Sequence, residues 1–203
     1  MTFFAVMLMV AAALTACGAK KQVAQQPTQP RPVASDPGLG GEILIPCIDE
    51  SMDDNEYFRD LGTATHINMQ SARTGALQAA QDMIMQKLGG YVEGLSETYS
   101  RTVAGQAQQE KVQRLMEGDM NKVVQEHINH AQKTCEKMYN KGAEGYTSFI
   151  AIQIPVKKLI DEMADVLSSN EELEIEFNRE RFRKYAKEKQ EQMLEHQKDK
   201  YGK

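Results

Sequence analysis

The stretch YFRDLGTATHINMQSARTGALQAAQDMIMQKL, residues 57–88, decides the fold of this 203-residue chain. Its first part, residues 57–65, predicts a β-strand with Gly62 inside it, a position where another backbone can come close. From about Asn68 the apolar residues recur at steps of three and four, which predicts one face of a helix. That face comprises Met69, Ala72, Ala76, Leu77, Ala80, Met83, Ile84 and Leu88. Its alanines would let the helix lie close to a sheet.

Two adjacent glycines, Gly89 and Gly90, follow this helix. A glycine pair is expected to break or kink a helix at that point. Apolar periodicity resumes only weakly after the pair, and a polar helix is predicted from Gln106 to about Met120.

Two later segments predict a β-hairpin. The first runs from about His127 to Tyr139, and the second, residues 146–154, is rich in β-branched and aromatic residues. Residues 140–145 between them contain two glycines and suit a turn. Pro155 stops the second strand, and the apolar spacing of residues 156–167 predicts another helix.

The C-terminal segment has its own helix-start signal. Ser168-Ser169-Asn170 supplies a capping residue, and Glu171 and Glu172 suit a helix N-terminus. Charged residues dominate from Arg179 onward, which indicates an exposed helix. A candidate partner-binding surface on it consists of Phe177, Arg179, Arg181, Phe182, Arg183 and Tyr185. The alternative is that these aromatic side chains pack back on the domain.

The N-terminal segment predicts export. Residues 3–14 are apolar but too few to span a bilayer as a finished helix, which is typical of a signal peptide. The run Leu14-Thr15-Ala16-Cys17 resembles the lipobox of bacterial lipoproteins, in which Cys17 would carry an acyl group such as palmitate. Residues 1–13 lack Lys and Arg, so either the n-region is degenerate or the true start lies upstream. Gly18 gives no inner-membrane retention signal, which makes the outer membrane the expected location.

The segment after Cys17 predicts a tether. Its glutamines, prolines and glycines have little to bury, so we expect an extended spacer. The expected organisation is a signal peptide over 1–16, a tether over 17–44, a folded domain over 45–168 and a charged helix over 169–203.

Net charge and cysteine content limit the possible partners and the compartment of the protein. The formal net charge is −5 and the isoelectric point is about 5.5, which argues against a nucleic-acid partner. Cys47 and Cys135 remain once Cys17 is assigned to lipid, and an even pair in an oxidising compartment suits a disulfide. Two separate small apolar residues are the alternative.

The order of these segments resembles the LPP20 lipoprotein family, which shares its small domain with the N-terminal part of a flagellar assembly protein. The strand with Gly62-Thr63-Ala64, the Ala-rich helix (Ala72, Ala76, Ala79, Ala80) and the strand 146–154 carry the resemblance, over roughly residues 56–165. The resemblance implies an α+β fold, in which one long helix packs on an antiparallel sheet of about three strands; the charged C-terminal helix is an addition. It implies a membrane anchor and no enzymatic role.

No residue pattern predicts a catalytic site, a metal site or a cofactor. His127 and His130 would share a face only on a helix, and the predicted strand separates them. Residues 49–54 are acidic but lack the ligand spacing of a calcium loop, so a solvated loop is expected.

The sequence therefore predicts a non-enzymatic, lipid-anchored cell-envelope protein with a binding or assembly role and an envelope protein as its partner. The alternatives are a periplasmic helical chaperone or coiled-coil adaptor and, less favoured, a hydrolase with an unrecognised site. Paired strands would favour the first, and a pocket gathering His127 or His130 with acids would favour the last.

Overall fold

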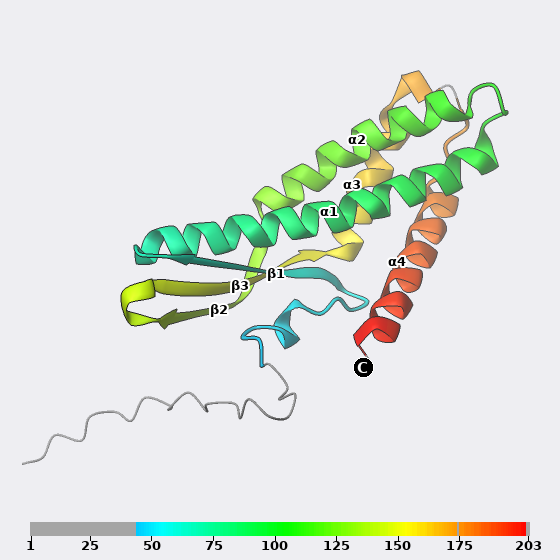
Figure 1. Ribbon diagram of the computed structural model, residues 1–203. Helices are drawn as coiled ribbons and strands as arrows, with labels where there is room; N and C mark the ends of the chain where they lie inside the picture. Colours follow the sequence, from blue (N-terminus) through cyan, green and yellow to red (C-terminus); the bar gives the residue numbers. More distant parts are fainter. Residues whose placement is uncertain (1–43, 174, 202–203) are drawn as a thin grey trace, which may run out of the picture. The chain divides into compact units, whose positions relative to one another are not determined.

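A computed structural model describes residues 44–173 and 175–201 of the chain (Figure 1). All of these residues belong to one compact unit, which begins at Leu44. The predicted signal peptide, Cys17 and nearly all of the predicted tether lie outside the described residues.

Four helices and a three-stranded antiparallel sheet make up the described unit, which confirms the predicted α+β fold. The strands are β1 (Tyr57–His66), β2 (Gln132–Asn140) and β3 (Tyr146–Pro155), in the order β1-β3-β2. The helices are α1 (Met69–Val103), α2 (Gln109–Asn129), α3 (Val156–Ser169) and α4 (Arg179–Tyr201). One short 3-10 turn, Asp49–Ser51, precedes β1, and two more, Gly142–Glu144 and Glu171–Leu173, lie between β2 and β3 and between α3 and α4.

The helix α1 covers one face of the sheet (Figure 1). Asn68 caps its start by accepting a hydrogen bond from the Ser71 backbone N–H at 3.1 Å. The contact is closest at Gly62 on β1, where an added Cβ would lie 2.1 Å from the Ala76 carbonyl oxygen and 2.2 Å from the Ala80 nitrogen. Because Gly62 has no side chain and the facing residues of α1 are alanines, the backbones of β1 and α1 can come into contact here.

The second half of α1 extends past the sheet into a group of helices (Figure 1). At 35 residues, α1 is about 52 Å long, far longer than the strands, which have nine or ten residues. Beyond the sheet it packs against α2 and α4, and α3 packs against both of these. The buried side chains of this half are Leu88, Tyr91, Val92, Leu95, Ser96, Tyr99 and Ser100.

The expected break at Gly89 and Gly90 is wrong, because α1 runs through both residues. Each glycine costs a helix roughly 1 kcal/mol relative to alanine. Burial of Leu88, Tyr91 and Val92, at roughly 1.5–3 kcal/mol for each large side chain, outweighs that cost.

The boundary between α2 and β2 also differs from the prediction. The predicted polar helix continues to Asn129, so His127 is helical and β2 begins only at Gln132. Val123, Val124 and Ile128 are buried at helical spacing, and this buried face extends the helix. The other strand, β3, pairs with β1 and β2 along its length and ends at Pro155, as predicted.

The C-terminal helix begins later than its predicted start signal. Residues 171–173 form a 3-10 turn, and α4 starts at Arg179. Asn178 supplies the cap, accepting a hydrogen bond from the Arg181 backbone N–H at 2.9 Å. Since α4 packs on α1 and α3, it belongs to the same compact unit as the predicted domain.

Replacing Gly62 with alanine should lower the free energy of unfolding by about 1–3 kcal/mol, because the new methyl group would overlap the α1 backbone. Urea denaturation followed by circular dichroism measures the change. Gly90→Ala is the matched control. Gly90 has open space around it, so this substitution should stabilise α1 by about 0.5–1 kcal/mol. Equal effects at the two sites would contradict the close packing of α1 on β1.

Candidate functional site

Residues 44–56, called the arm below, cross the sheet face opposite α1. The arm contains the 3-10 turn Asp49–Ser51, which contacts all three strands. Along β1, Phe58 and Gly62 face the helix, so Leu61 between them faces the arm. The arm therefore covers apolar surface on the side of the sheet that α1 leaves open.

A disulfide fixes the arm to the sheet. Cys47 of the arm and Cys135 of β2 are bonded, with their Cα atoms 5.7 Å apart, which is one of the two alternatives that the sequence left open. Cys47 adopts a left-handed backbone conformation with φ of 63°. Next to the bond, the Thr134 hydroxyl donates to the Glu50 carbonyl oxygen at 3.2 Å.

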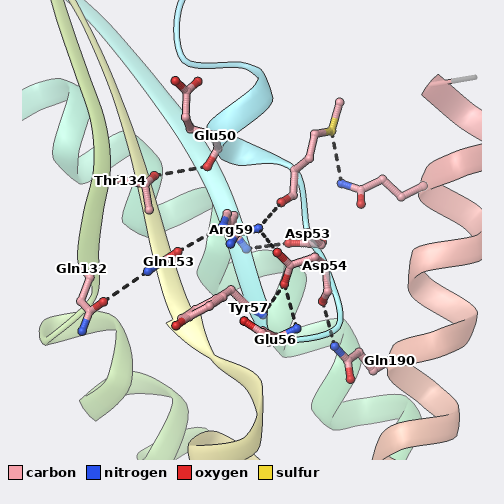
Figure 2. A network of polar contacts seen from close by, with 12 residues as sticks. Glu50, Asp53, Asp54, Glu56, Tyr57, Arg59, Gln132, Thr134, Gln153 and Gln190 are labelled. Carbon is pink, nitrogen blue, oxygen red and sulfur yellow. Dashed lines mark hydrogen bonds and ion pairs between the residues drawn. The ribbon is translucent and has the colours of Figure 1, made fainter. Parts of the chain in front are cut away.

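Arg59 of β1 is the centre of a polar network that holds the rest of the arm (Figure 2). Its Nη1 donates to Asp54 Oδ2 at 2.6 Å and to the Met52 carbonyl oxygen at 2.9 Å. Its Nε donates to Gln153 Oε1 on β3 at 3.1 Å. One side chain thus links the arm to two strands.

Lys87 of α1 completes the attachment from the other side of β1. Its ammonium group forms ion pairs with Asp53 of the arm and Asp60 of β1, both at 3.1 Å, and donates to the Arg59 carbonyl oxygen. Asp53 in turn accepts from the Arg59 backbone N–H at 2.6 Å. Since β1 is an edge strand, these contacts satisfy backbone groups that would otherwise be open to another strand.

The pKa values of the Asp53 and Asp54 carboxyl groups are shifted in opposite directions. Burial raises the pKa of Asp53, and the Lys87 ammonium opposes this only in part. Burial would also raise the pKa of Asp54, but hydrogen bonds from the Arg59 side chain and from the Glu56 and Tyr57 backbone N–H groups lower it below its ordinary value.

A cavity of about 780 Å³ opens between the arm, α1 and the last turns of α4. Two contacts from α4 bring its end to the arm: Gln190 Nε2 donates to the Asp54 carbonyl oxygen at 3.0 Å, and Gln197 Nε2 lies 3.8 Å from the Met52 sulfur. Side chains that line the cavity include Met52, Met83, Lys87, Lys189, Met193 and His196. The three walls come from segments far apart in the sequence.

The predicted partner-binding residues of the C-terminal segment 169–203, called the tail below, lie elsewhere, around Tyr99 of α1. Phe182 is fully buried, and its ring centroid is 5.7 Å from that of Tyr99. Phe177 and Tyr185 are half-buried against the same ring. The alternative that the aromatic side chains pack back on the domain is thus correct, and a docking role for Phe182 is wrong. The helix α1 extends far enough to receive these rings.

The arginines of the tail remain at the surface. Arg179 pairs with Asp165 at 2.6 Å, and Arg183 pairs with Asp161 at 2.9 Å, both acids being on α3. Arg181 is exposed. These pairs attach α4 to α3.

The histidines at the end of α2 have separate surroundings. His127 is buried, and its Nε2 lies 2.8 Å from Glu162 Oε2 on α3. His130 is exposed, and its ring bonds to the Glu126 carbonyl oxygen. Within residues 44–173 and 175–201, no group of three or more His, Cys, Asp or Glu side chains is placed to hold a metal ion.

Sequence reasoning missed the charged group that holds the arm. It treated residues 49–54 as a solvated loop, whereas Asp53 and Asp54 bind Lys87 and Arg59. The one available signal was the composition of the arm, which has five acids and no Lys or Arg of its own. Such a run needs cations from elsewhere in the chain if it is to pack against the domain.

Comparison with protein-family models, with curated proteins and with solved structures found no match to this chain. The resemblance to the LPP20 family therefore stays a prediction. In the part of the chain that the structure describes, no helix is both long enough and apolar enough to cross a bilayer.

Removing the disulfide should detach the arm and destabilise the domain. The bond closes a loop between residues 88 positions apart, so the Cys47→Ala/Cys135→Ala double variant should lose about 3–5 kcal/mol of unfolding free energy. Urea denaturation measures the loss, and amide exchange should show faster exchange in residues 44–56. Reduction of the wild-type chain is the control and should give a similar loss. An unchanged denaturation midpoint in both cases would contradict the role of the bond.

Asp54→Asn should weaken the domain at neutral pH but not in strong acid. The folded-state pKa of Asp54 is lowered, so its ionised form stabilises the fold above the ordinary pKa of 3.8, and this contribution is lost as the pH falls through the lowered value. Comparing urea midpoints of the variant and the wild type from pH 7 to pH 2 tests this. The midpoints should converge at the acid end, and a constant gap would show that the Arg59–Asp54 charge pair is not the cause.

Proposed function

We propose that this protein is a lipid-anchored component of the bacterial cell envelope that acts by binding or assembly. Cys17 carries the acyl group, the residues up to 44 act as the tether, and the unit that begins at Leu44 performs the binding. The anchor holds the protein to the outer membrane.

The Cys47–Cys135 disulfide is the observation that carries the proposal. Disulfides persist in oxidising compartments such as the bacterial periplasm and are rare in the cytosol. This inference is independent of the lipobox-like run at Cys17. An export signal and a structural disulfide in the same chain support the same location.

The position of the disulfide suits an anchored domain. Cys47 is the fourth residue of the described unit, so the chain from the proposed anchor enters the domain next to a covalent cross-link. A pull on the tether would reach β2 through this bond and β1 through the Asp53 and Asp54 contacts. The entry point is thus joined to the sheet by a covalent bond and by charged contacts.

The paired strands favour this proposal over a helical chaperone or coiled-coil adaptor. β3 pairs with both β1 and β2. The long helix α1 already packs against the sheet, α2 and α4. The hydrolase alternative depended on a pocket that gathers His127 or His130 with acids. His127 instead bonds to Glu162 between α2 and α3, and neither histidine lines the cavity at the arm.

Expression in a bacterial host tests the anchor. The wild-type protein should gain acyl mass by intact mass spectrometry and appear in the membrane fraction, whereas Cys17→Ala should do neither. Cys47→Ala is the matched control, because it removes a cysteine from the domain and leaves Cys17 intact; it should still be acylated. A wild-type chain that is soluble and unmodified would overturn the proposal, and an acylated chain would direct crosslinking toward envelope partners.

A further inference from the structure

We propose that the cavity between the arm, α1 and α4 binds one long-chain carboxylate, with its apolar chain along the methionines and its head group at Lys189. This goes beyond the proposed anchor, because the ligand is a separate molecule and the residues involved are all in the described unit.

The size and walls of the cavity suit a flexible apolar chain. Its volume of about 780 Å³ lies in the range of small-molecule sites, roughly 300–1,000 Å³. Ile48, Leu61 and three methionines give it apolar walls. Methionine side chains are unbranched and polarisable, so they adapt to a ligand without a fixed shape. Met83 is 49% exposed and would be covered by such a ligand.

The charges at one end of the cavity are already paired. Lys87 forms ion pairs with both Asp53 and Asp60. Two carboxylates share one ammonium group, so this end keeps an excess negative charge. A second anion would be repelled from it.

The other end of the cavity has a cation with no partner among the described residues. The Lys189 side chain fills the space above Gly94 of α1, where an added Cβ would lie 2.5 Å from its Cε. Among the described residues, no ion pair or hydrogen bond involves the Lys189 ammonium group. Gly94 lies seven positions after Lys87 on the same helix, which separates the two ends by about 10 Å.

These charges fix the orientation of the ligand. A carboxylate gains a charge-assisted bond at Lys189 and avoids the acids at Asp53 and Asp60. Its chain then runs along Met193 and Met83 toward Met52, and all three of these side chains line the cavity. The carboxylates that line the cavity, Asp53 and Asp60, are already bonded to Lys87, and a trimethylammonium head has no N–H group with which to replace that lysine.

Calorimetric titration of the purified full-length Cys17→Ala chain, which carries no acyl group, tests the proposal with the disulfide formed and in detergent-free buffer. Dodecanoate is the probe, used below its micelle concentration. Hexanoate tests the need for a long chain, and dodecyltrimethylammonium tests the need for a negative head. Dodecanoate should bind at one site and at least about tenfold more tightly than either control. Equal binding of the cationic probe, or no saturable binding of dodecanoate, would overturn the proposal.

Two pairs of variants locate the site. Lys189→Gln should weaken dodecanoate binding about tenfold, whereas Lys184→Gln, an exposed lysine on the same helix outside the cavity, should not. Met83→Gln should weaken binding about fivefold, whereas Met85→Gln should not, because Met85 does not line the cavity. All four positions are half-buried or exposed, so the variants should fold, which circular dichroism checks. Equal effects within either pair would contradict the site.

The outcome does not depend on Cys17. A chain that binds dodecanoate but is never acylated would retain the cavity proposal and lose the anchor. An acylated chain that does not bind dodecanoate would retain the anchor and lose the cavity proposal.

Discussion

The backbone contact between α1 and β1 at Gly62 is the constraint on which the other elements depend. An added methyl group there would overlap the Ala76 and Ala80 backbone, so the helix can lie on the sheet only because Gly62 has no side chain. This contact sets the direction of a helix about 52 Å long. The part beyond the sheet then offers Leu88 to Tyr99 as the surface on which α2 and α4 pack.

Opposite charges attach the arm to this frame. The arm brings five acids and no cation, whereas β1 and α1 supply Arg59 and Lys87. Most of these pairs are partly buried, where removing one partner leaves a charge that is costly to desolvate. The disulfide adds a covalent bond on the opposite edge of the sheet. The arm is therefore held at both edges, and its attachment creates the wall of the cavity that α1 and α4 face.

The tail shows how one set of residues supports two interpretations until its neighbours are known. Phe177, Phe182 and Tyr185 would form a docking surface on an isolated helix. Tyr99 on α1 gathers all three rings, and its hydroxyl accepts a hydrogen bond from the Asn178 backbone N–H at 2.8 Å. The aromatic edge thereby becomes part of the core, and the last turns of α4 are brought to the arm.

The sequence by itself determined the elements whose signals are local. β-forming side chains are frequent in residues 57–65 and 146–154, and the alanines after Asn68 recur with a helical period. The α+β class follows from these local patterns. Tertiary packing decided the rest: the unbroken α1 at Gly89 and Gly90, the helical His127, the Lys87–Asp53 pair and the cavity. Each of these depends on contacts between segments distant in sequence, and local propensities of about 1 kcal/mol are too small to compete with such burial.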